Sequence, residues 1–213
     1  MSEFIMEQSV IDNLPNILKN STDTLENISY DNINDEYITN SQKIAIDFDK
    51  VKNLYNNENN NSFELKSNDA LYIVKNNIYY FIEFKNGDLK DYKNKLSYTI
   101  KKDLQLKIYD SWFILSDIEY LDGKKYISNM FSLSKNCIVY ILVYNSKKNG
   151  KLIMHNRFLN NSKQNLNRSK SSKIDLELFG LAKFEKFLLK KVYIYDEKEF
   201  ETKFINGTIA NEP

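Results

Sequence analysis

Residues 66–87 read KSNDALYIVKNNIYYFIEFKNG. Two apolar runs flank a pair of asparagines in this stretch, a pattern typical of a β-hairpin. Charged residues interrupt it: Asp69 opens the first run, and Glu83 lies inside the second with Lys85 two residues on. A charge buried in an apolar strand is costly unless it is paired or binds a metal. These three residues are therefore the first candidates for function.

The length of the hairpin loop decides whether the two acids meet. Residues directly opposite in an antiparallel pair point to the same face of the sheet. With a two-residue loop at 76–77, Asp69 would face Phe84 and point away from Glu83. A three-residue loop at 75–77 puts Asp69 opposite Glu83, and a β-bulge would also correct the phase. A joint site for the two acids thus predicts an odd loop or a bulge.

An Asp at the head of one strand, followed by Glu-x-Lys towards the end of the next, resembles the PD-(D/E)xK nuclease superfamily, the restriction-endonuclease-like enzymes. The matching residues are Asp69, Glu83 and Lys85, with 13 residues between the two acids, and Asn68 stands in place of the proline of the motif. The resemblance spans residues 60–145. It implies an α/β fold in which a mixed central β-sheet is flanked by helices, with a restriction-endonuclease-like core (αβββαβ).

The resemblance also implies a metal-dependent nuclease that hydrolyses phosphodiester bonds of nucleic acid. Asp69, Glu83 and the carbonyl of Phe84 would bind Mg²⁺ or Mn²⁺, hard cations that prefer oxygen ligands. Lys85 would orient or help to deprotonate the attacking water and stabilise developing charge. A further carboxylate sometimes comes from an upstream helix, and the sequence leaves three candidates open: Asp49, Glu58 and Glu64.

The sequence around the hairpin predicts the other elements of such a core. Asp47 is expected to cap a helix that begins before the hairpin. Apolar residues spaced by three and four from Leu96 to Leu115 predict a long amphipathic helix after it. Residues 136–144 are almost wholly apolar, as in a strand covered on both faces. The superfamily often places a Lys or Gln of the long helix near the site, and three lysines are open to that role or to a solvated face: Lys101, Lys102 and Lys107.

Two other parts of the chain differ in the sign of their charge: the N-terminal residues are acidic, and residues 147–173 are basic. Residues 1–40 are expected to form an acidic arm or helical appendage beside a nuclease-like domain over residues 41–213. Residues 147–173 hold eight Lys or Arg and no Asp or Glu, and we expect a flexible basic loop. Such a loop suits phosphate contact, or it is a mobile surface loop that balances the acidic arm. The predicted nucleic-acid-binding residues are Lys147, Lys148, Lys151, Arg157, Arg168 and Lys170.

Composition sets broader bounds. The chain has 213 residues and a net charge of +1, so no global field draws it onto nucleic acid. A single cysteine, Cys137, allows no internal disulfide and fits a reducing compartment. The first residues lack the pattern of a signal peptide, and no apolar run reaches the roughly 20 residues of a membrane span. We expect a cytoplasmic protein that binds nucleic acid, DNA in preference to RNA, away from membranes, with a homodimer possible.

Two other functions are consistent with the same residues. One is a catalytically inactive protein of the nuclease fold that acts as an immunity or interaction protein, which the small size and near-neutral charge fit. The other is a binding module in which Asp69, Glu83 and Lys85 form a structural ion-pair cluster. Turnover distinguishes an active nuclease from the inactive protein, and metal binding distinguishes it from the structural ion-pair cluster. The complete triad favours an active nuclease, for which defence against foreign DNA is the commonest setting.

Overall fold

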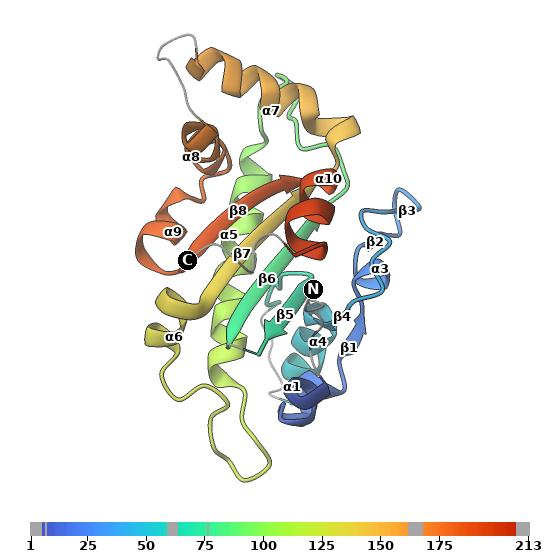
Figure 1. The fold of residues 1–213 in the computed structure, drawn as a ribbon, viewed down its shortest axis with the longest axis vertical. Helices are drawn as coiled ribbons and strands as arrows, with labels where there is room; N and C mark the ends of the chain where they lie inside the picture. Colours follow the sequence, from blue (N-terminus) through green and yellow to red (C-terminus); the bar gives the residue numbers. More distant parts are fainter. Residues whose placement is uncertain (1–5, 7, 59–63, 76, 162–167, 208–213) are drawn as a thin grey trace.

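The computed structural model describes residues 6, 8–58, 64–75, 77–161 and 168–207. Its centre is a six-stranded sheet in the order β1-β4-β5-β6-β7-β8. Within the run β1, β4, β5 and β6, each strand is antiparallel to the next. Strands β6, β7 and β8 are parallel to one another. The strands are β1 (Thr22–Thr24), β4 (Ile44–Asp47), β5 (Ala70–Val74), β6 (Ile78–Lys85), β7 (Ile138–Tyr144) and β8 (Lys191–Asp196). The predicted α/β class with a mixed, helix-flanked sheet is confirmed (Figure 1).

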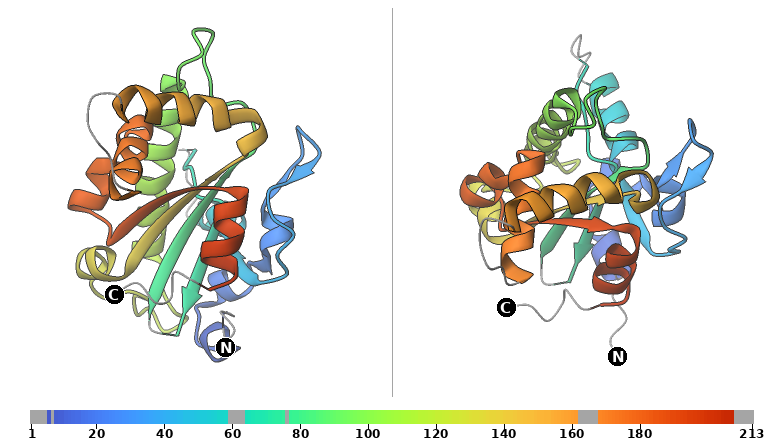
Figure 2. Two further views of the ribbon diagram at one scale, coloured as in Figure 1. Left: turned by 45° about the horizontal axis from the view of Figure 1, so that its top comes forward. Right: turned by 90° about the horizontal axis from the view of Figure 1, so that it is seen from above.

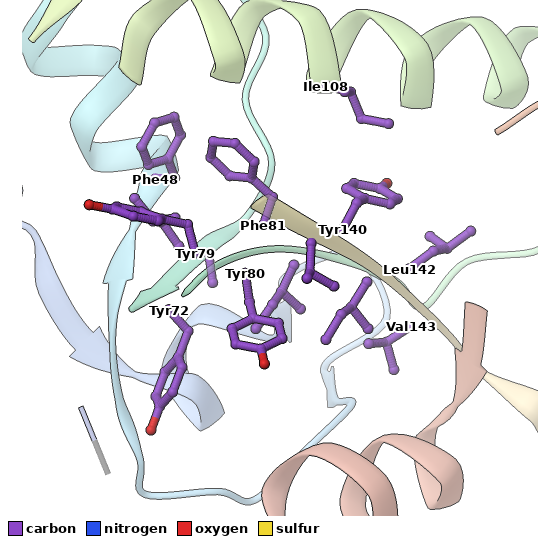
Figure 3. Packing of buried hydrophobic residues seen from close by; sticks show 14 of the residues in the cluster. Phe48, Tyr72, Tyr79, Tyr80, Phe81, Ile108, Tyr140, Leu142 and Val143 are labelled. Carbon is purple, nitrogen blue, oxygen red and sulfur yellow. The ribbon is translucent and has the colours of Figure 1, made fainter. Parts of the chain in front are cut away.

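Helices cover both faces of the sheet. On one face, α4 (Phe48–Glu58) packs Phe48 edge-on against Phe81 of β6, with ring centroids 5.4 Å apart. The long helix α5 (Tyr98–Asp117) lies on this same face, and Figure 3 shows its Ile108 above Phe81 and Tyr140. On the opposite face, the π-helix η1 (Phe200–Ile205) packs against the even-numbered residues of the hairpin. Alternation along β6 therefore assigns Phe81 and Glu83 to the face under α5.

The predicted helices and strands around the hairpin are confirmed. Asp47 accepts a hydrogen bond from the backbone N–H of Lys50 and so caps α4. The long helix is α5, and every residue of β7 is buried, as expected for a strand that is covered on both faces. Before β7, the chain forms α6 (Met130–Cys137). After β8, Asp196 and Glu199 form a capping box at α10 (Glu197–Glu199).

The first 40 residues are more closely joined to the domain than expected. They form α1 (Gln8–Asp12), α2 (Asn16–Lys19), β1, α3 (Leu25–Ile28), β2 (Tyr30–Asp31) and β3 (Glu36–Tyr37). β1 pairs with β4 as the edge strand of the central sheet, and Leu18 and Leu25 are fully buried. Only the small hairpin of β2 and β3 lies apart from the main sheet (Figure 1). Burial of these two leucines integrates residues 14–28 into the core.

The basic stretch 147–173 was predicted to be a flexible loop, and that prediction is wrong over its described residues. The chain forms α7 (Ser146–Asn161) and α8 (Arg168–Phe179) instead. Buried Leu152 and Ile153 anchor α7, and α8 is held by buried apolar residues of its own. Packing of a few apolar residues outweighs a polar composition with weak periodicity. Gly180, at φ +70°, ends α8 before α9 (Ala182–Phe187), because glycine adopts this conformation freely.

None of the helices in the described ranges combines the length and the apolar character that a membrane span requires.

Candidate functional site

The hairpin between β5 and β6 places the two acids on one face. Val74 pairs with Ile78, so three residues separate the last paired positions, and Ala70 pairs with Ile82 at the other end. One step beyond that pair, Asp69 lies opposite Glu83. The odd loop length that a joint site requires is therefore confirmed, and no bulge is needed to bring the carboxylates together.

Asp69 and Glu83 share one cation from α5. The Nζ atom of Lys107 lies 3.1 Å from Oδ1 of Asp69 and 2.7 Å from Oε1 of Glu83. The other oxygen of Asp69 accepts a hydrogen bond from the backbone N–H of Phe84 at 2.6 Å. The side chain of Glu83 has no solvent exposure, whereas those of Asp69 and Lys107 are each 16% exposed. The three charged side chains are thus largely buried beneath α5.

Lys85 extends this arrangement along α5. Its Nζ lies 2.8 Å from Oε1 of Glu83 and 3.2 Å from Oδ2 of Asp103. Asp103 in turn binds the ammonium of Lys66 through its other oxygen. Positive and negative groups alternate through six side chains, which we call the charge cluster: Lys66, Asp103, Lys85, Glu83, Lys107 and Asp69.

Burial and mutual attraction act in opposite directions on the pKa values of the cluster. Burial, together with the charge of Glu83, raises the pKa of Asp69 to about 7, against the charges of Lys107 and Lys85 and the hydrogen bond from the N–H of Phe84. Burial alone would lower the pKa values of Lys85 and Lys107, but the charges of Glu83 and Asp69 outweigh it and raise both. Burial would raise the pKa of Asp103, yet its two lysine partners leave it lowered. Both central lysines therefore remain cations at neutral pH.

Helix α5 also positions the strand that carries Asp69. Asp110 accepts a hydrogen bond from the backbone N–H of Lys66, and Ser111 Oγ accepts one from that of Asn68, at 2.9 and 2.8 Å. These bonds satisfy backbone groups just before β5 and hold Asp69 at the first position of the hairpin.

The three upstream acids occupy different places. Asp49 accepts a hydrogen bond from Ser67 Oγ, two residues before Asp69. Glu58 and Glu64 are exposed. Asp49 thus contacts, through Ser67, the residues just before β5. The third carboxylate of the charge cluster is instead that of Asp103.

Buried polar atoms lie beside the charge cluster without hydrogen-bond partners among the described residues. They are Oε2 of Glu83 and the hydroxyl of Tyr140. An unpaired buried polar atom costs free energy, so a bound group that supplied a partner would recover that free energy. Oε2 of Glu83 is the one that a metal ion would satisfy directly.

The donor set fits a hard divalent cation in type. Asp69 and Glu83 offer carboxylate oxygens, and the carbonyl of Phe84 lies on the same edge of β6 as its N–H, which points at Asp69. In the described part of the chain, no group of three or more His, Cys, Asp or Glu side chains is arranged to hold a metal. Lys107 Nζ lies within ion-pair distance of both carboxylates, so a metal cation between them would displace the ammonium group of Lys107.

Sequence reasoning left part of the cluster unidentified. Lys107 was one of three open lysines on α5, and Lys66 and Asp103 were not predicted. A signal existed: Asp103 and Lys107 stand four residues apart, which puts them on one face of a helix. Lys102 lies instead over the ring of Tyr98, with Nζ 5.5 Å from the centroid.

The predicted nucleic-acid-binding residues fall into three groups. Lys147 and Lys151 are exposed at the start of α7. Lys148 pairs with Glu36 of β3 at 2.9 Å, and Arg157 pairs with Asp175 of α8. Arg168 and Lys170 lie in α8, and their side chains are outside the described part. Two of the predicted phosphate contacts are thus committed to intramolecular ion pairs.

Comparisons with protein families, with curated proteins and with solved structures give no match to this chain. The function of the charge cluster must therefore be argued from its geometry and chemistry.

Proposed function

We propose that this protein is a metal-dependent nuclease that hydrolyses phosphodiester bonds, with DNA as the expected substrate and defence against foreign DNA as the expected setting. The observation that carries the proposal is the position of Asp69 directly opposite Glu83 on neighbouring strands, with Lys85 on the same face. A buried carboxylate oxygen without a partner in the described chain supports it.

The order of elements supports a restriction-endonuclease-like core. Helix α4, the hairpin of β5 and β6, helix α5 and strand β7 follow one another in the same general order as in such a core. One departure is clear: over the described residues, two strands lie between α4 and α5, and β4 supplies the third antiparallel strand from before α4. Fold and activity are separate claims, and the activity depends on the site.

Asp69, Glu83 and the Phe84 carbonyl would hold Mg²⁺ or Mn²⁺. When bound, such a cation supplies Lewis-acid polarisation of a phosphate and acidifies water. The role of Lys85 follows from its environment: although burial alone would lower its pKa, the charge of Glu83 raises it. An ammonium that stays protonated is a poor general base. We therefore assign Lys85 to orienting the water and donating hydrogen bonds to phosphate oxygens.

A second candidate is a catalytically inactive protein of the same fold that serves as an immunity or interaction protein. The observation that favours it is the internal balance of the charge cluster, in which three lysines offset three carboxylates. A balanced buried network can specify a core without binding any ligand. In that case Lys107 would be a permanent partner of the two acids.

Cleavage of plasmid DNA, single-stranded DNA and RNA, each with Mg²⁺, Mn²⁺ or EDTA, tests the proposal. Wild type should cleave at least one substrate with metal and none with EDTA. Lys85→Ala should bind Mn²⁺ and lose cleavage, whereas Asp69→Ala should lose both. The matched control is Lys124→Ala, because Lys124 is 81% exposed in a surface ion pair. Cleavage by Lys85→Ala at the wild-type rate would refute the assignment, and absence of both metal binding and turnover in wild type would favour the inactive protein.

A further inference from the structure

The connection between β6 and α5 carries an unusual mixture of lysine and tyrosine. Residues 88–102, which we call the Tyr–Lys segment, read DLKDYKNKLSYTIKK and hold five lysines against two aspartates. The two tyrosines, Tyr92 and Tyr98, are 88% and 71% exposed. These two rings bury little apolar surface, so core packing does not explain them.

The segment has a defined conformation. Lys90 and Leu96 form an isolated β-bridge, and the carboxylate of Asp91 accepts hydrogen bonds from the backbone N–H groups of Lys93 and Lys95. Its base is tied to α7, because Asn149 accepts from the N–H of Leu89. Figure 2 shows the resulting loop projecting from the molecule beside α7. Tyr92 is thus presented at the tip of a closed loop.

Cations accompany both rings. Nζ of Lys93 lies 5.1 Å from the ring centroid of Tyr92, and Nζ of Lys102 lies 5.5 Å from that of Tyr98. Within the described ranges, no carboxylate lies within ion-pair distance of four lysines of the segment: Lys93, Lys95, Lys101 and Lys102. Exposed rings interleaved with unpaired cations match the chemistry of nucleic acid, which offers flat bases and anionic phosphates.

The segment connects directly to the charge cluster at both ends. Lys85 and Asn86 precede it, and Asp103, which binds Lys85, follows it on α5. Asp103 lies five positions after Tyr98 on α5, a rise of about 7.5 Å along the helix axis and a rotation of about 140° around it. A polymer that contacts Tyr98 therefore lies about one and a half helical turns along α5 from Asp103 of the charge cluster.

We propose that the Tyr–Lys segment binds single-stranded nucleic acid and guides it to the charge cluster. Tyr92 and Tyr98 stack on unpaired bases, and the lysines contact phosphates. This inference rests on the proposed nuclease function and names its substrate class. Unpaired strands suit the segment better than a duplex, because bases inside a duplex stack on each other and offer no free face to a protruding ring.

Binding in EDTA tests this proposal without any need for catalysis. Fluorescence anisotropy would be measured with labelled oligonucleotides of about 12 nucleotides, as single-stranded DNA, single-stranded RNA and duplex DNA. The double variant Tyr92→Ala/Tyr98→Ala should bind single strands at least about tenfold more weakly, with its duplex affinity unchanged. Tyr92→Phe/Tyr98→Phe should bind like wild type, because phenylalanine retains the stacking face. Tyrosine-dependent binding of either DNA or RNA single strands supports the proposal and identifies the preferred backbone.

Two further variants separate the effect of the two tyrosines on binding from that of an exposed ring elsewhere and from that of the lysines. Phe187→Ala is the matched control, since Phe187 is a 72% exposed ring with Lys186 5.0 Å from its centroid on remote α9; its binding should equal that of wild type. Lys101→Gln/Lys102→Gln should reduce the dependence of log Kd on log salt by about 0.7 for each lysine.

Unchanged binding in the Tyr→Ala variant, equal loss on duplex, or no binding of single strands by wild type would overturn the proposal. Tyrosine-dependent binding without Mn²⁺-dependent cleavage would uphold this inference and refute the nuclease. Cleavage confined to duplex DNA would uphold the nuclease and refute the binding of single strands by the Tyr–Lys segment.

Discussion

Lys107 on α5 and Glu83 on β6 form an ion pair with 2.7 Å between Nζ and Oε1, and the carboxylate of Glu83 has no solvent exposure. Lys85 donates to the same oxygen at 2.8 Å, which leaves Oε2 without a partner in the described chain. Two cations therefore converge on one atom of the most enclosed acid in the cluster. The consequences for stability and for activity can be measured separately.

Replacement of Lys107 by methionine should destabilise the fold. The variant leaves Asp69 without its cation and removes one of the two partners of buried Glu83. Breaking a buried pair costs about 3 kcal/mol, and in this variant the two acids keep a smaller compensating charge, from Lys85 beside Glu83. Urea unfolding of Lys107→Met in EDTA would measure this loss, with Lys124→Met at the exposed pair as a control that should change by less than about 0.5 kcal/mol. Equal stability of Lys107→Met and wild type would show that the pair contributes nothing to folding.

Asp103→Asn should reduce turnover without weakening substrate binding. Asp103 holds Lys85 in place from α5 at 3.2 Å, so the variant frees one side of that ammonium. A loss of about 1.4 kcal/mol of transition-state stabilisation corresponds to a tenfold lower kcat. Steady-state kinetics on the cleaved substrate would test this, with Asp117→Asn at the surface pair with Lys125 as control. A rise in KM with unchanged kcat would instead place Asp103 in substrate binding.

The stability of the metal-free protein should fall as the pH rises towards 8. Burial and Glu83 raise the pKa of Asp69 to about 7, so the folded state holds this proton more tightly than the unfolded chain does. The corresponding stabilisation is complete below about pH 4 and is lost as the pH passes through 7. Its size is on the order of 2–4 kcal/mol.

Urea unfolding in EDTA at several pH values, comparing wild type with Asp69→Asn, would show this dependence in wild type and a flatter profile in the variant. Asp122→Asn, at an exposed surface acid, should keep the wild-type profile. Parallel profiles for wild type and Asp69→Asn would contradict the raised pKa.

Asn77 should be replaceable by glycine but not by alanine. Its φ of +56° lies in the left-handed region, and its N–H donates to the carbonyl of Val74 to close the loop. Alanine there costs about 1 kcal/mol, whereas glycine and asparagine tolerate this conformation. Denaturant midpoints of Asn77→Ala and Asn77→Gly would measure the difference. If both variants lose equal stability, the side chain of Asn77 matters more than its backbone angle.

Much of the fold was predictable because local patterns and tertiary packing agree. The hairpin, the long helix α5 and the buried strand β7 each have a periodicity or an apolar run long enough to specify one element. The basic stretch 147–173 was not predictable, because its composition is that of a loop, while buried Leu152 and Ile153 within it and Phe179 just beyond it fold it into two helices. Such packing depends on partners distant in sequence.

The order of residues along the chain is enough to place Asp69, Glu83 and Lys85 in one hairpin, and to show that the acids meet across an odd loop or a bulge. Strand alternation is a local rule, so these positions follow from counting residues. Three features depend on the folded arrangement: the loop has three residues, Lys107 rather than Lys101 or Lys102 meets the acids, and Asp103 and Lys66 complete the cluster. Helical periodicity identifies a face, whereas the turn of α5 that lies over β6 is set by packing across the whole core.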